Sequence, residues 1–139
     1  LPFDSKFYRR GTNQRVYAPT HAHHPCAEWV RSSSEAYAWA WRLGMSLLDE
    51  YTFRYKRSHA TAPIIRTLEM WPPSIPHETH AEPPCAMPEE HWVYDGGCLD
   101  AVLSYRAYYH DGKRHLLQYT RRAPPTWLRG VAVYKAAPG

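Results

Sequence analysis

Residues 24–59, HPCAEWVRSSSEAYAWAWRLGMSLLDEYTFRYKRSH, decide the predicted fold because they carry the clearest helical pattern in the chain. Pro25 suits a first helical position, where its missing N–H costs nothing, so a short helix is expected to run to about Arg31. Ser32 and Glu35 then have the capping-box spacing S-x-x-E, which predicts that a long helix begins there. Its apolar stripe recurs at steps of three and four and comprises Tyr37, Trp41, Gly44, Leu48, Tyr51 and Tyr55.

A charged row lies on the second half of the same predicted helix. Glu50, Arg54 and Arg57 follow one another along it. Glu50 and Arg54 are four positions apart and can pair on one face, where a solvated ion pair contributes only about 0.3–0.5 kcal/mol. The alternative is functional: a carboxylate for acid–base chemistry beside arginines that hold an anionic backbone. The sequence leaves both readings open.

The rest of the chain predicts more helix, interrupted by turns and prolines. A short helix is expected over 64–71, and another over 98–110 after a break at Asp95-Gly96-Gly97. Helical structure is expected to continue over 113–121. The irregular parts are a basic arm over 1–24, a Pro-rich loop over 72–88 and an extended tail over 124–139.

These elements predict one mainly α domain over 1–139, built as a compact bundle of three to four helices with a long Pro-rich loop and irregular termini. The chain has 139 residues, enough for a core without disulfide staples. Three widely spaced cysteines predict neither a disulfide framework nor a thiolate metal site, which favours a reducing cytoplasm. No apolar run approaches the roughly 20 residues needed to span a bilayer, so no membrane partner is expected.

Charge and aromatic content permit contact with nucleic acid. Seventeen basic residues against thirteen acidic ones give a formal charge of +4. Six Trp and eleven Tyr exceed three Phe, so most rings carry a polar group. Residues 105–122, YRAYYHDGKRHLLQYTRR, interleave tyrosines with cations, as expected for single strands or flipped nucleotides. An amphipathic helix with ordinary basic solvent positions explains the same pattern.

Histidines raise a metal hypothesis that we do not adopt. His21, His23 and His24 share one segment, and His77 with His80 share the Pro-rich loop. Two such clusters could converge on zinc, but neither has the H-E-x-x-H spacing of helical ligands beside a general base. Scattered histidines are more often surface residues, so neither a metal nor another cofactor is predicted.

Three stretches carry a resemblance to a largely uncharacterised family of small phage-encoded proteins. In residues 24–55 it rests on His-Pro, an aromatic residue, Ser, an aromatic-rich helix and Glu-x-x-x-Arg-Tyr. AMPEEHWV (86–93) and SYRAYYHDGKRHLLQYTRRAPPTW (104–127) resemble the second half of that family. More distantly, the order of features is similar to the pyrimidine-dimer DNA glycosylases of the endonuclease V type from T-even phages.

The distant resemblance implies a compact helical protein with a basic, aromatic DNA-binding face. It also implies that an amine attacks the sugar C1′ while a carboxylate supports the intermediate. In those enzymes the amine is the chain's own N-terminus and the carboxylate lies in the first helix. No helix is predicted here before His24, so the amine is not assigned and Glu50 is the substitute carboxylate.

We therefore expect a phage-type DNA-associated protein, related to base-excision glycosylase/lyases, in the cytoplasm of an infected bacterial host. The alternative is a non-enzymatic phage structural or interaction module, whose Tyr/Trp surface meets a protein partner or a second copy. The residue roles under the first hypothesis are phosphate contact for Arg54, Arg57, Arg106 and Lys113, base stacking for Tyr109 and Trp127, and acid–base work for Glu50 with His24.

Overall fold

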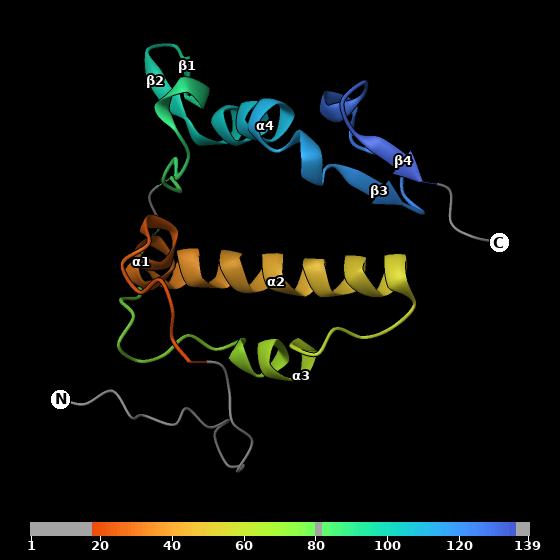
Figure 1. The fold of residues 1–139 in the computed structure, drawn as a ribbon. Helices are drawn as coiled ribbons and strands as arrows, with labels where there is room; N and C mark the ends of the chain where they lie inside the picture. Colours follow the sequence, from red (N-terminus) through yellow and green to blue (C-terminus); the bar gives the residue numbers. More distant parts are fainter. Residues whose placement is uncertain (1–17, 80–81, 136–139) are drawn as a thin grey trace. The chain divides into compact units, whose positions relative to one another are not determined.

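The computed structural model describes residues 18–79 and 82–135 (Figure 1). Within these residues it contains four α-helices, several 3-10 turns and four strands of three residues each, so the prediction of a mainly α protein is confirmed. The described residues form two compact units. Unit 1 comprises 18–49 and 58–79, and unit 2 comprises 50–57 and 82–135. The expectation of a single domain stays a prediction, and the arm over 1–17 lies outside the described residues.

The first two helices of the chain follow the predicted pattern with one correction at the cap. α1 (Pro25–Ser32) begins at the expected proline, and α2 (Ser34–Tyr55) follows. The cap of α2 is Ser33, whose Oγ accepts a hydrogen bond from the Ala36 N–H at 3.1 Å. Ser32 was the wrong choice, because it still belongs to α1 and donates to the Trp29 carbonyl. The extended Ser33 separates the two helices.

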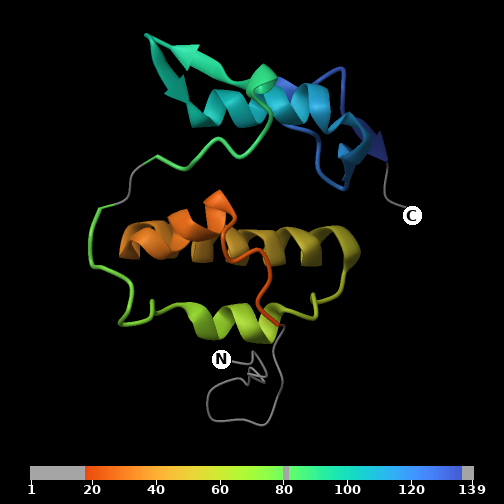
Figure 2. The same cartoon turned by 60° about the vertical axis from the view of Figure 1, so that its left-hand side comes forward.

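In unit 1 the first half of the predicted apolar stripe faces α3 (Ala62–Ile65) and the 3-10 turn that continues it (Arg66–Leu68). Trp41 Nε1 donates to the Ile65 carbonyl at 3.0 Å, and the Tyr37 hydroxyl donates to the Leu68 carbonyl at 2.8 Å. A Cβ at Gly44 would lie 3.4 Å from Ile65 Cγ2, so glycine permits this close approach. Figures 1 and 2 both show α3 alongside α2. The helix expected over 64–71 therefore starts and ends earlier than predicted.

The Pro-rich loop is irregular throughout its described residues, as predicted. Its first part packs on the start of α2. The Ser34 N–H donates to the Pro76 carbonyl at 2.8 Å, and Ile75 is buried. The loop thus satisfies a backbone donor that the first turn of a helix leaves without a partner.

Unit 2 contains a hairpin that the sequence pattern did not predict. β1 (Val93–Asp95) and β2 (Cys98–Asp100) pair antiparallel around Gly96 and Gly97, which both have positive φ. The prediction of helix from Cys98 was wrong by three residues. A two-residue turn with positive φ at both positions closes a tight hairpin, and only then does α4 (Ala101–Gly112) begin. Asp100 caps it, because its Oδ1 accepts from the Leu103 N–H at 2.8 Å.

The segment after α4 is not the helical continuation expected over 113–121. A 3-10 turn (Arg114–Leu116) leads into β3 (Gln118–Thr120), which pairs parallel with β4 (Val133–Lys135) in the tail. Another 3-10 turn (Thr126–Leu128) lies between β3 and β4 in the sequence, and it packs on α4. Leu117 and Leu128 are buried, so tertiary packing overrides the local helical preference here.

No helix in the described part of the chain is both long and apolar enough to cross a membrane.

Candidate nucleic-acid interface

Glu50 lies between two arginines of unit 2. Arg54, one helical turn further along α2, donates from Nε to Glu50 Oε1 at 2.8 Å. Arg122, which follows β3, donates from Nε to both carboxylate oxygens, at 3.1 Å to Oε1 and 2.9 Å to Oε2. The expected contact of Glu50 with Arg54 is present, and Arg122 extends it to an Arg–Glu–Arg cluster (Arg54, Glu50 and Arg122).

Each arginine of the Arg–Glu–Arg cluster also lies over an aromatic ring. Arg54 Cζ is 4.8 Å from the centroid of Tyr119, and Arg122 Cζ is 4.7 Å from that of Phe53. Arg54 Nη1 donates further to the Gln118 carbonyl of β3 at 3.3 Å. A guanidinium over a ring is attracted by the ring quadrupole and keeps its edge N–H groups for hydrogen bonds. Both arginines are therefore held from two sides.

The backbone around the cluster has two non-glycine residues in the left-handed region. Arg121 has a φ of 66° directly after β3, and Lys56 has a φ of 55° where α2 ends. Such conformations are uncommon outside glycine and are found preferentially in turns and functional sites. The turn at Arg121 brings Arg122 to Phe53 and Glu50.

The two arginines stabilise the charged form of Glu50. Partial burial alone would raise the pKa of this carboxyl, but the hydrogen bonds from Arg54 and Arg122, with their positive charges, outweigh burial and lower the pKa below 4.5. A carboxyl with a lowered pKa is ionised at neutral pH and is a poor proton donor there. Glu50 therefore acts as a fixed negative charge that neutralises part of two positive ones.

The other cations expected to contact phosphates also lie over rings of unit 2. Arg57 Cζ is 6.0 Å from the centroid of Tyr51. Arg106 Cζ is 5.5 Å from the centroid of Trp127, and Lys113 Nζ is 5.1 Å from that of Tyr108. Every cation assigned to phosphate contact from the sequence thus has an aromatic neighbour, although these neighbours were not predicted.

The two rings expected to stack on bases differ in their surroundings. Tyr109 is exposed and meets Tyr108 edge-on, with centroids 6.4 Å apart. Trp127 is half-buried, and the Arg106 guanidinium lies over its ring. Tyr109 therefore offers the more accessible ring of the two.

His24 has a structural role in unit 1. Its Nδ1 accepts a hydrogen bond from the Cys26 N–H at 3.1 Å, which makes His24 the cap of α1. Glu50 belongs to unit 2. The suggested partnership of His24 with Glu50 in acid–base chemistry stays a prediction.

The histidines weighed above as possible metal ligands have other neighbours. His23 pairs with Glu28 at 3.6 Å, and the His77 ring meets Trp71 edge-on at 5.5 Å. His80 lies outside the described residues. Among residues 18–79 and 82–135, no group of three or more His, Cys, Asp or Glu side chains is arranged to hold a metal ion.

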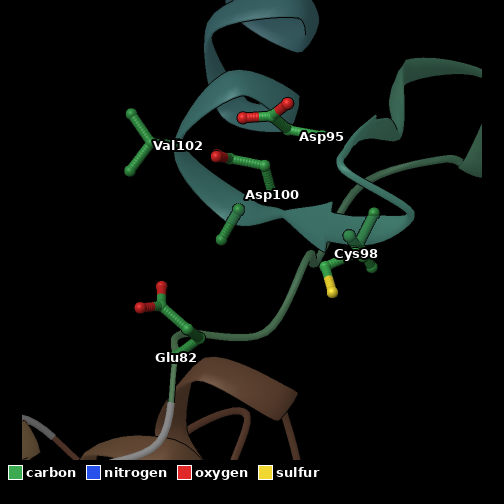
Figure 3. A pocket seen from close by; sticks show the side chains of 7 residues that line it. Glu82, Asp95, Cys98, Asp100 and Val102 are labelled. Atoms are coloured by element: carbon green, nitrogen blue, oxygen red, sulfur yellow. The ribbon is translucent and has the colours of Figure 1, made fainter.

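Unit 2 also has an acidic pocket at the β1–β2 hairpin. A pocket of about 270 Å³ is lined by Glu82, Asp95, Cys98 and Asp100, together with Leu99, Ala101 and Val102 (Figure 3). In the described part of the chain none of its three carboxylates pairs with a Lys, Arg or His. Negative charge at this pocket repels phosphate, so the pocket is not part of the candidate interface.

Sequence reasoning included Tyr119 and Arg122 only as members of the basic, aromatic run over 105–122, without an individual role or a link to Glu50, and it gave Phe53 no role. The only local signal was the Arg121-Arg122 pair at the end of a basic, aromatic run. Arg122 is 72 positions from Glu50, so no helical or strand spacing connects them.

Comparison of the chain with protein-family models, curated proteins and solved structures found no match.

Proposed function

We propose that unit 2 binds DNA through its ring-supported cations. The observation that carries this proposal is the pairing of Arg54, Arg57, Arg106 and Lys113, and also Arg122, with an aromatic ring. Guanidinium groups held in this way keep donors for phosphate oxygens and lose less side-chain entropy on binding. Cations with adjacent rings are the combination used to bind single-stranded nucleic acid.

The distribution of charge in unit 2 supports the same proposal. Between residues 101 and 135, Asp111 is the only acidic residue. The acidic residues of the preceding segment, 82–100, include those that line the hairpin pocket. A polyanion would therefore be attracted to one part of unit 2 and repelled from another, which orients it. The basic residues of 101–135 are Arg106, Lys113, Arg114, Arg121, Arg122, Arg129 and Lys135.

A finer version of the proposal is base-excision chemistry of the glycosylase/lyase type. It assigns acid–base work to Glu50 and His24 and base stacking to Tyr109 and Trp127. Its support is the resemblance of the motifs and the ionised state of Glu50, because a carboxylate can stabilise a positively charged sugar or imine intermediate. This version of the proposal also includes the expected compact bundle of three to four helices, which would be the scaffold that presents these residues.

The test is a titration of labelled single-stranded and damaged duplex DNA at several salt concentrations. We expect log Kd to depend linearly on log salt, because each neutralised phosphate releases counterions. Arg106→Gln should reduce the magnitude of this slope by about one, which corresponds to the loss of one phosphate contact. Arg129→Gln is the matched control, since Arg129 is exposed in the same segment and has no ring contact among the described residues. Binding that does not change with salt would contradict DNA recognition.

Borohydride in a parallel sample tests the finer version. If an amine attacks the sugar, reduction of the imine traps the protein on DNA, and a peptide map then names the amine. Salt-dependent binding without trapping on damaged duplex would contradict the lyase and leave a DNA-binding protein.

The second candidate function is a protein-interaction module. Its support is the number of large apolar side chains exposed in unit 2, among them Tyr94, Leu116, Val133 and Tyr134. Val133 and Tyr134 are adjacent on β4, and exposed apolar and aromatic side chains that lie together favour association with a partner or a second copy. A molar mass that rises with protein concentration in light scattering, together with no affinity for DNA, would favour this candidate.

A further inference from the structure

We infer that Glu50 is a positioning residue that prepares Arg54 and Arg122 to bind one phosphate group of DNA. This inference rests on the proposed function and assigns a specific site within it. It gives Glu50 a role different from acid–base catalysis. The carboxylate would act on the bound phosphate only through the two arginines.

The geometry of the Arg–Glu–Arg cluster leaves donors for a ligand. A carboxylate commonly binds an arginine through two parallel N–H groups. Here Arg122 uses only its Nε, which both Glu50 oxygens share. Among the described residues its terminal nitrogens have no carboxylate or carbonyl partner, and its side chain is 55% exposed. Two guanidinium groups against one carboxylate also leave a net positive charge, which suits an anion.

The surroundings hold this arrangement in place before any ligand arrives. Arg54 is fixed by the Glu50 carboxylate, the Tyr119 ring and the Gln118 carbonyl. Arg122 is fixed by Glu50 and by the Phe53 ring, and Lys56 Nζ lies 5.8 Å from the centroid of the same ring. Donors that are ordered in advance bind a phosphate with a smaller entropic cost. Without Glu50, the two like charges would repel each other and separate.

Glu50 therefore has an effect on DNA affinity opposite in sign to that of an ordinary acidic residue. Removing a negative charge near a polyanion normally strengthens binding. If Glu50 positions the arginines, removing its charge weakens binding instead. Glu89 provides the comparison, because it is an exposed glutamate of the same unit with no ion pair among the described residues.

The experiment measures Kd for a labelled single-stranded oligonucleotide with wild type, Glu50→Gln and Glu89→Gln. We expect Glu50→Gln to weaken binding by about fivefold or more, as for loss of a charge-assisted contact, and Glu89→Gln to leave it unchanged or strengthen it. Equal or tighter binding by Glu50→Gln would overturn the inference while leaving the proposed function intact. Absence of salt-dependent binding by wild type would overturn both.

Arg122→Lys keeps the inference testable if Glu50→Gln does not fold. This exposed substitution keeps the charge but removes the Nε donor that contacts Glu50. We expect a weakening similar to that of Glu50→Gln, and little further loss when both changes are combined, because they break the same contact. Wild-type affinity in Arg122→Lys, or losses that simply add in the double variant, would show that Glu50 does not act through Arg122.

Discussion

Unit 2 uses carboxylates in two different ways, and the difference shows what a carboxylate needs in order to become part of a site. Around the β1–β2 hairpin, Asp95 and Asp100 line a pocket without a cationic partner among the described residues. Glu50 is held by two arginines, each supported by an aromatic ring. The hairpin carboxylate of Asp100 serves the backbone as a helix cap. Glu50 instead orders two long side chains.

The largest expected effect is a loss of stability when a buried side chain is removed from the segment that carries the basic residues of unit 2. Leu128 is 1% exposed in the 3-10 turn that packs on α4. Leu128→Ala should lower the free energy of unfolding by about 2–5 kcal/mol, because it removes buried methyl groups and leaves a cavity. Leu116→Ala is the matched control, since Leu116 is 60% exposed, and should change stability by at most about 0.5 kcal/mol. Urea unfolding measures both, and equal losses would contradict a core at Leu128.

A smaller effect distinguishes the two kinds of carboxylate directly. Asp100→Ala should cost about 1 kcal/mol, because the Leu103 N–H loses its acceptor at the start of α4. Asp100→Asn should cost almost nothing, since an amide oxygen caps a helix as well as a carboxylate does. The corresponding change from carboxylate to amide at Glu50 places an NH₂ group against an arginine N–H. Glu50→Gln should therefore destabilise the folded protein, unlike Asp100→Asn. Thermal unfolding of Asp100→Ala, Asp100→Asn and Glu50→Gln measures these differences in stability. A loss of stability in Asp100→Asn as large as that in Asp100→Ala would contradict the prediction.

The smallest expected effect is a dependence of stability on pH. The pKa of Glu50 is lower in the folded chain than its ordinary value of 4.5, so the unfolded chain binds more protons in this range. The contribution of Glu50 is therefore fully present above pH 4.5 and is lost as pH falls through the lower, folded pKa. Urea midpoints measured as pH falls should decrease more steeply for wild type than for Glu50→Gln.

Asp111 also makes the stability decrease at low pH, so its contribution has to be separated from that of Glu50. A hydrogen bond from His110 lowers the pKa of its carboxyl, so acid also weakens this contact. Because Asp111 is present in both proteins, the difference between wild type and Glu50→Gln isolates Glu50. Identical slopes for the two proteins would mean that Arg54 and Arg122 do not stabilise the Glu50 charge in solution.

Local signals were sufficient where the structure is local. Pro25 correctly predicted the start of α1, and the apolar steps at Tyr37, Trp41 and Gly44 correctly predicted the face of α2 that packs on α3. Proline density correctly predicted the irregular loop. These features depend on backbone geometry within a few residues, which neighbouring side chains decide.

Predictions of helix were wrong where pairing with another strand competes with the local helical preference. Residues 118–120 have a helix-compatible pattern, yet they form β3 because β4 supplies a parallel partner from residues 133–135. Cys98–Asp100 looked like the start of α4, yet it pairs with β1 across a two-glycine turn. In both cases hydrogen bonds to a partner strand replace those within a helix. The partner of β3 is distant in the sequence, whereas the partner of β2 is adjacent, and Gly96-Gly97 was the local signal of that hairpin.

The sequence by itself determined α1, the body of α2, the irregular Pro-rich loop and the spacing that allows Glu50 to pair with Arg54, because each depends on residues no more than a few positions apart. Only the tertiary structure decided that Arg122 reaches Glu50 from 72 positions away and that Tyr119 and Phe53 lie against the two arginines. The physical reason is that charge and ring contacts act through space, and the packing of β3 and of the turn at Arg121 sets those distances.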